Sequence, residues 1–232
     1  MRRSQGCGAE LPKSISPSTM MDSEAKHQIT QQGMVADIMT AAGEKFLVSL
    51  SSPLELLLNF HLKSQSKEAL RAGLHEHINT LRSRGFEPNR IMVDSFKSLV
   101  AVQNAFPGIE VDPSGAGYHL DKIDTKIRRI KEIMRSVIAG VPYKLAKERI
   151  KDLATYTISR MNIKSTSALN DGTCPGVHFT GQKPDYRSEL NLAFGDYVEA
   201  YNPKAAERSN DVTMARTESC IVLYPMANRN GS

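Results

Sequence analysis

The chain is poor in aromatic residues: it has no tryptophan, and tyrosine and phenylalanine together make up 6% of its 232 residues. It has three cysteines, Cys7, Cys174 and Cys220, which lie far apart and include no pair with metal-ligand spacing. Neither a disulfide framework nor a zinc finger is therefore indicated. The sparse, odd number of cysteines fits a reducing compartment.

Long apolar runs and a zinc-binding histidine pattern are also missing. No apolar stretch reaches the length that crosses a membrane, and Met1–Gly8 lacks the apolar core of a signal peptide. We therefore expect an intracellular protein, in the nucleus or the cytoplasm. His75 and His77 are two residues apart, which suits neither one helix face nor a zinc-binding helix, so both are expected at the surface.

Positive charge is concentrated in one part of the chain. The total net charge is only +5, and residues 1–120 contain 12 Lys and Arg against 12 Asp and Glu. Residues 121–164 contain 12 against 5, whereas residues 181–232 contain 6 against 7. Localised positive charge attracts a phosphate backbone. The alternative interpretation is a solvated basic helix face.

The first half of the chain predicts a mixed sheet with helices. Residues 1–31 are polar and predict a flexible lead-in. Apolar runs at 34–39, 46–50 and 54–62, separated by turn signals, predict three adjacent antiparallel strands, although the third run also has helical propensity. The elements expected next are a helix over 66–84 with Ser66 as its N-cap, a strand at 90–94, a short helix at 98–102, a strand at 109–111 and a glycine-rich loop at 112–117.

The second half predicts two amphipathic helices up to about residue 161, interrupted at Gly140-Val141-Pro142. Residues 165–190 predict an irregular linker. Residues 191–232 predict a short, incomplete β-rich segment with strands at 196–201 and 220–224. The main domain, residues 32–164, is therefore expected to be an α/β domain with a mixed sheet flanked by helices.

Three aspartates lie where a two-metal nucleic-acid enzyme needs carboxylates. Asp37 lies inside the apolar run 34–39, Asp94 ends the run 90–94, and Asp124 opens a basic helical stretch. A carboxylate is costly in an apolar strand unless it is paired or binds a metal. In a mixed sheet the first and fourth strands can be neighbours, so Asp37 and Asp94 can converge, and Asp124 can face them. Paired divalent ions bound by carboxylates activate water and stabilise a leaving oxygen.

Each residue also has a purely structural interpretation. Asp37 can be a surface acid on an edge strand, and Asp94 can cap the helix that follows it. Asp124 can be favoured by the helix macrodipole, and Asp121 competes with it as the third acid. The basic residues of this stretch are either solvated charges or phosphate contacts; those that we assign to nucleic-acid binding are Lys126, Arg128, Arg129, Lys131 and Arg135.

Several stretches resemble the integrase core of copia-type retrotransposon polyproteins, within the retroviral-type integrase superfamily. The similarity covers about residues 30–226 and is most distinctive in the second half. The stretches that carry it are Gly115–His119, Asp124–Glu132, Tyr156–Asn162, Cys174–Gly181 and Leu192–Glu199.

The resemblance implies a ribonuclease-H-like fold that binds two Mg²⁺ or Mn²⁺ ions through two Asp and one Glu. It also implies DNA as the partner, both element ends and target, a homo-oligomer, and no membrane partner. By position, the two aspartates match Asp37 and Asp94, and the third acid matches Asp124, where the family usually has Glu. Asp94 is followed by Ser95-Phe96 instead of a small or polar sequence with Gly, and the family's upstream zinc-binding residues have no counterpart.

These observations lead to three hypotheses. The first is an integrase-like enzyme, intact or degenerate, that cleaves and joins phosphodiesters during DNA integration and forms a fragment of a mobile element. The second is a non-catalytic DNA-binding remnant that kept the basic helices. The third is a ribonuclease-H-like nuclease without joining activity. The third acid and its reach distinguish the first two hypotheses.

Overall fold

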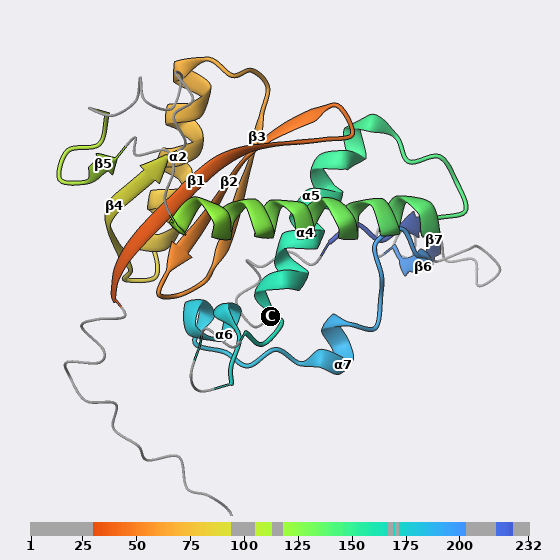
Figure 1. The fold of residues 1–232 in the computed structure, drawn as a ribbon. Helices are drawn as coiled ribbons and strands as arrows, with labels where there is room; N and C mark the ends of the chain where they lie inside the picture. Colours follow the sequence, from red (N-terminus) through yellow and green to blue (C-terminus); the bar gives the residue numbers. More distant parts are fainter. Residues whose placement is uncertain are drawn as a thin grey trace, which may run out of the picture.

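The computed structural model describes residues 30–93, 105–112, 118–166, 169, 172–202 and 217–224. Its elements follow one another as two groups (Figure 1). The first group is β1 (Gln31–Ala41), β2 (Glu44–Ser52), β3 (Leu57–Leu62), α2 (Lys67–Arg82), β4 (Glu87–Val93) and β5 (Glu110–Asp112). The second is α4 (Tyr118–Gly140), η2 (Lys147–Arg149), α5 (Ile150–Asn162), α6 (Pro175–Thr180), α7 (Tyr186–Glu189), β6 (Tyr197–Tyr201) and β7 (Thr217–Ile221).

Five strands form one mixed sheet in the order β3-β2-β1-β4-β5. β1 pairs antiparallel with β2 and parallel with β4, and β4 pairs parallel with β5. The three adjacent antiparallel strands and the pairing of the first and fourth strands are therefore confirmed. With its flanking helices, this sheet confirms the predicted α/β fold class with a mixed sheet, and β6 and β7 form a separate antiparallel hairpin.

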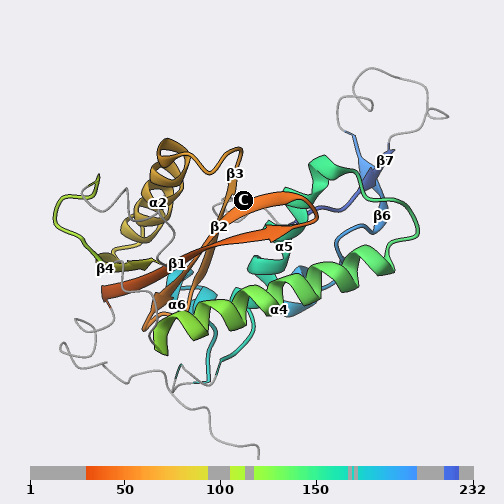
Figure 2. The same cartoon turned by 45° about the horizontal axis from the view of Figure 1, so that its top comes forward.

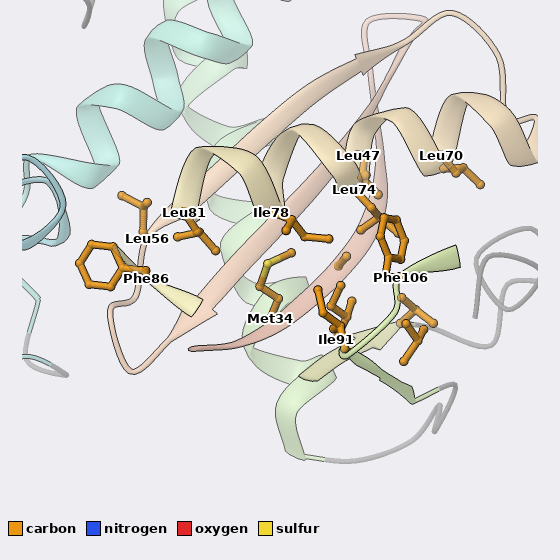
Figure 3. Close-up of a cluster of buried hydrophobic side chains, with 14 of the residues drawn as sticks. Met34, Leu47, Leu56, Leu70, Leu74, Ile78, Leu81, Phe86, Ile91 and Phe106 are labelled. Carbon is orange, nitrogen blue, oxygen red and sulfur yellow. The ribbon is translucent and has the colours of Figure 1, made fainter. Parts of the chain in front are cut away.

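Helices cover both faces of the sheet, so the molecule has three layers. Figure 2 shows the sheet between α2 on one side and α4 on the other. The core under α2 includes Met34, Leu74 and Ile78 (Figure 3). The core under α4 and α5 includes Val35 and Met39. Side chains alternate along a strand, so β1 contributes to both cores.

Some elements differ from those expected. β4 begins at Glu87, three residues before the predicted start, and α4 begins at Tyr118. The predicted linker 165–190 contains the short helices α6 and α7, which have too few turns to show a helical period. The predicted lead-in up to residue 29, the short helix at 98–102 and most of the loop at 112–117 lie outside the described residues. No helix in the described ranges is long and apolar enough to cross a membrane.

His75 is exposed as expected, but the prediction of a surface position for His77 is wrong. His77 is only 2% exposed. It lies two helical turns after Leu70 and one turn after Leu74, and therefore on the apolar face of α2. The prediction considered only the spacing between His75 and His77 and not the position of His77 relative to the apolar face.

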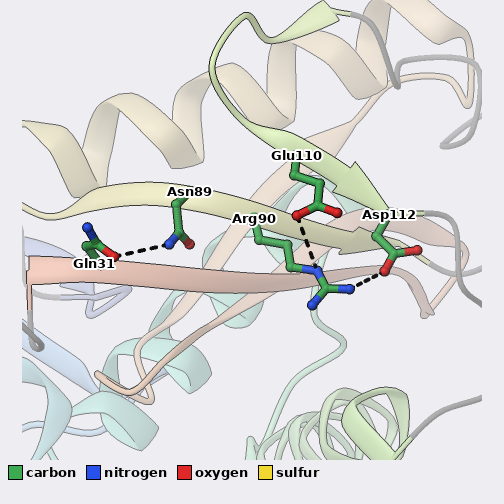
Figure 4. A network of polar contacts seen from close by, with 5 residues as sticks. All are labelled: Gln31, Asn89, Arg90, Glu110 and Asp112. Carbon is green, nitrogen blue, oxygen red and sulfur yellow. Dashed lines mark hydrogen bonds and ion pairs between the residues drawn. The ribbon is translucent and has the colours of Figure 1, made fainter.

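Side-chain contacts on both sides of β4 fix this strand within the sheet (Figure 4). Arg90 donates a hydrogen bond to the Asp112 carboxylate, and its Nε lies 4.0 Å from Oε2 of Glu110, both on β5. Asn89 donates to Oε1 of Gln31 on β1 over 3.4 Å. These contacts support the register that brings the end of β4 beside β1.

Candidate active site and nucleic-acid interface

Asp37 lies on β1, the central strand of the sheet, and its side chain is half-buried. Val35 and Met39, two residues away on either side, belong to the core under α4 and α5. Because side chains alternate along a strand, Asp37 lies on the sheet face that α4 covers. The Ile38 amide donates a 2.6 Å hydrogen bond to Asp37 Oδ1. The alternative of an edge-strand surface acid is wrong, because β1 has a neighbour on each side.

Asp94 lies outside the described residues. The residue before it, Val93, is the last residue of β4 and is fully buried. Val93 pairs in parallel with Ala36, which is the residue before Asp37. The described part of β4 thus runs beside β1 up to the residue that precedes each predicted acid.

Asp124 lies in the second turn of α4 and is exposed, whereas the sequence predicts it at the head of the helix. The first-turn position that the macrodipole favours belongs to Asp121. Ile123 and Ile127, on either side of Asp124, are buried against the sheet. The described residues contain no cluster of three His, Cys, Asp or Glu side chains that could bind a metal. Since Asp94 is not among them, the predicted set of three carboxylates stays a prediction.

The five cations assigned to nucleic-acid binding fall on two flanks of α4. Lys126 and Arg129 line a pocket between α4 and α5. Lys131 and Arg135 line a second pocket on the other flank, beside the turn between β1 and β2. Arg128 is exposed and lies one helical turn before Lys131, so it belongs to the second flank. The sequence predicts one basic stripe, and the helix separates it into two.

Two further cations lie on the first flank, outside the basic run predicted from the sequence. Arg160 on α5 and Lys164 just after it line the same pocket as Lys126 and Arg129. Arg160 belongs to the Tyr156–Asn162 stretch that resembles integrases, which was the available signal. The pocket itself depends on the packing of α5 against α4, and this packing cannot be read from sequence spacing.

Other residues of the distinctive second half have packing roles. Asn162 Oδ1 accepts a 2.9 Å hydrogen bond from the Leu57 amide, and its Nδ2 donates 2.8 Å to the Leu57 carbonyl. Asn162 thus attaches the end of α5 to the first residue of β3. The Tyr156 and Phe194 rings lie 5.6 Å apart, which joins α5 to the segment before β6. We therefore assign these side chains a structural role.

A polar cluster at the turn between β1 and β2 lies apart from Asp37. Glu44 Oε2 is 2.7 Å from His61 Nε2, and Glu44 Oε1 is 3.3 Å from Lys147 Nζ. Hydrogen bonds hold the pKa of Glu44 below its usual value; the one from His61 has the larger effect and the one from Lys147 the smaller. The arrangement is an ion-pair network that joins the hairpin to η2, and such networks shift pKa values without a catalytic role.

No protein-family model matches the chain, and no curated protein matches it. Among solved structures, the chain is similar to the catalytic core domain of BIV integrase, with a TM-score of 0.49 and 10% sequence identity. The similarity covers 64% of this chain and 93% of that chain. Fold does not determine activity, so function has to be argued from the residues of this chain.

Proposed function

We propose that the chain is an integrase-like polynucleotidyl transferase core that binds DNA and catalyses metal-dependent cleavage and joining of phosphodiesters, as part of a retrotransposon-type element. The observation that carries this proposal is the position of Asp37. It is a half-buried carboxylate on the central strand, on the face covered by the basic helix α4. The hydrogen bond from Ile38 offsets part of the cost of burying this charge, and a metal ion would offset more.

The positions of two neighbouring elements support the same proposal. The parallel pairing of Ala36 with Val93 favours a site at which Asp37 and Asp94 meet. Asp124 shares one helical flank with Lys131, which lies seven residues later and lines the pocket beside the end of β1. An acid and phosphate-binding cations on one flank suit a site that acts on a nucleic-acid backbone.

The proposed carboxylates fit a divalent metal site, because Asp37, Asp94 and Asp124 supply only oxygen ligands, which Mg²⁺ and Mn²⁺ prefer. Bound metal would supply Lewis-acid activation of water or a DNA 3′-hydroxyl and stabilisation of the leaving oxygen. Asp37 would hold and orient the metal ion, while Arg128 and Lys131 position the phosphate backbone.

A non-catalytic DNA-binding remnant is the second candidate. Asp124 has one methylene fewer than the Glu expected at this position, and its side chain is exposed on α4. Arg128 and Arg135 on the same helix are also exposed, so DNA binding does not require the carboxylates. A nuclease without joining activity is the third candidate, and it shares all of the site residues.

Oligonucleotide nicking and strand-transfer assays with Mg²⁺ and Mn²⁺ test the catalytic proposal. Asp37→Asn should lower turnover at least roughly a thousandfold, the scale for removing one member of a catalytic group. Asp124→Glu should raise turnover, because the longer side chain restores reach to the metal. Glu148→Gln, an exposed acid in η2, is the control and should leave turnover unchanged.

The outcomes separate the candidates. Unchanged turnover in Asp37→Asn would assign the activity to another site. Nicking without strand transfer would favour the nuclease. If neither the native chain nor Asp124→Glu shows turnover while DNA binding is retained, the non-catalytic remnant is the better account.

A further inference from the structure

A basic pocket lies between α4 and α5, on the flank of α4 away from Asp124. Its volume is 360 Å³. Cationic side chains from two helices and the segment after α5 line it, together with Leu57 from β3 and Met161 from α5. The cations are Lys126, Arg129, Arg160 and Lys164.

The charges around this pocket do not balance. Glu55 is the acidic side chain that lines it, is 7% exposed, and lies 3.8 Å from Lys126 Nζ. Lys122 lies at the same distance from Glu55, so this carboxylate already faces two cations. Arg129 forms an ion pair with Glu132 over 3.1 Å, on the same helix. In the part of the chain that the structure describes, neither Arg160 nor Lys164 has a carboxylate within ion-pair distance. The pocket therefore has excess positive charge.

Within the described residues, contacts other than ion pairs fix Arg160 in place. Its Nη2 donates a 3.0 Å hydrogen bond to the Leu192 carbonyl, and its guanidinium lies over the Tyr156 ring, 5.0 Å from the centroid. Its Nε and Nη1 are buried and have no hydrogen-bond partner in the described structure. A cation that is partly desolvated and rigidly positioned attracts an anion more strongly than a solvated one.

The lining indicates what kind of anion fits. Besides the cationic side chains, Ser165 and Thr166 line the pocket and contribute hydroxyl groups. The described residues that line the pocket include no aromatic ring on which a base could stack. Donors without a stacking surface suit phosphate oxygens and carry no base preference.

We propose that this pocket binds a backbone phosphate of the nucleic acid, which makes Arg129 and Lys164 nucleic-acid contacts on the flank of α4 opposite Arg128 and Lys131. This inference rests on the proposed function, because it takes DNA as the partner. The two flanks then bind different phosphates of the same strand or duplex. Arg160 acts through its fixed charge, and Lys164 contacts the phosphate from the segment just after α5.

DNA binding by the full chain tests this proposal, measured as fluorescence anisotropy of a labelled duplex over a series of salt concentrations. Three double variants each remove two charges: the pocket pair Arg129→Ala/Lys164→Ala, the flank pair Arg128→Ala/Lys131→Ala, and the control pair Lys63→Ala/Lys67→Ala. Lys63 and Lys67 are exposed and lie just before and at the start of α2. Circular dichroism checks that each variant is folded.

The pocket pair should weaken binding to unrelated sequences and reduce the slope of log K against log salt by about one for each lost contact. The control pair should leave the slope unchanged. A pocket pair that behaves like the control overturns the inference, while a weakened flank pair would still support the proposed function. If the native chain does not bind DNA, both proposals fail.

Inorganic phosphate distinguishes a nucleic-acid contact from a site for free phosphate. If phosphate raises the melting temperature of the native chain above that in chloride at equal ionic strength, and the pocket pair loses this effect, the pocket binds phosphate groups. If the pocket pair then binds DNA normally, the site serves a free phosphate ligand and the inference about the nucleic acid is wrong.

Discussion

His77 lies on the apolar face of α2, opposite Ser49 of β2, and the two side chains are 2% and 1% exposed. Its Nδ1 lies 2.7 Å from Ser49 Oγ. Burial lowers the pKa of His77 to about 4, so the ring is neutral at pH 7. Although serine and histidine can form a nucleophilic pair, this pair is closed to any substrate and its role is structural.

Stability should therefore fall as the pH is lowered from about 6.5 towards 4. The unfolded chain binds a proton on His77 near pH 6.5, but the folded chain does so only near pH 4. The group's contribution is fully present above pH 6.5 and is lost as the pH falls through this window. Between pH 7 and pH 5 the free energy of unfolding should drop by roughly 2 kcal/mol from this group.

Urea denaturation at the two pH values measures this drop, and His77→Gln is the informative variant because its amide remains polar but does not titrate. His75→Gln is the matched control, since His75 is exposed one turn away. His77→Gln should show a smaller drop than the native chain and His75→Gln an equal one. An equal drop in all three proteins would assign the pH dependence to other groups.

Asp37 and His77 show what sequence can reveal about single residues. Asp37 is recognisable because five apolar residues surround it within the run 34–39, so a buried carboxylate is predicted directly. His77 is flanked by Glu76 and followed two residues later by Asn79, so its local sequence looks exposed. Only the helical period that links it to Leu70 shows its burial, and histidine does not mark that period.

The hairpin of β6 and β7 is attached to the helical layer through a tight contact at Gly195. The Gly195 amide donates to the Val222 carbonyl over 2.9 Å, and its own carbonyl accepts from the Tyr143 hydroxyl over 3.0 Å. Gly195 has a φ of +91°, and a Cβ there would lie 2.5 Å from Cγ1 of Val141. Glycine is required both by the backbone conformation and by the space.

Gly195→Ala should therefore destabilise this attachment, and Gly85→Ala provides the matched control. Gly85 has a similar φ of +80°, but a Cβ there meets nothing within 4 Å. Both variants incur backbone strain of about 1 kcal/mol, and Gly195→Ala adds a steric cost of roughly 1–3 kcal/mol. The Val222 amide donates a 2.9 Å hydrogen bond to the Asp196 carbonyl, next to Gly195. Hydrogen exchange at this amide should accelerate in Gly195→Ala alone. Equal exchange in both variants would show that the contact with Val141 relaxes freely.

The elements that sequence predicts best are those with several repeats of a period. The strands β1 and β2 and the helices α2 and α4 have long apolar patterns and were all expected. The four-residue helix α7 has no such pattern, and the start of β4 is polar at Glu87, so these were missed or shortened. The pocket between α4 and α5 could not be predicted from the sequence for a different reason, because it depends on how two helices pack.

At the scale of the whole molecule, α4 separates two regions of positive charge. One flank carries Arg128, Lys131 and Arg135 together with Asp124, near the end of β1. The other faces α5 and the pocket that contains Arg160. In the first region, Asp37 on the sheet and the basic helix above it are proposed to form a metal-dependent site.

Anomalous diffraction from crystals soaked in Mn²⁺ tests this proposed site, because it locates the metal without requiring turnover. We expect an anomalous peak within about 2.5 Å of a carboxylate oxygen of Asp37, shared with Asp94, which disappears in crystals of Asp37→Asn. A peak at another site, such as the Glu44–His61 pair, or no peak at Asp37 at saturating Mn²⁺, would contradict the proposed active site.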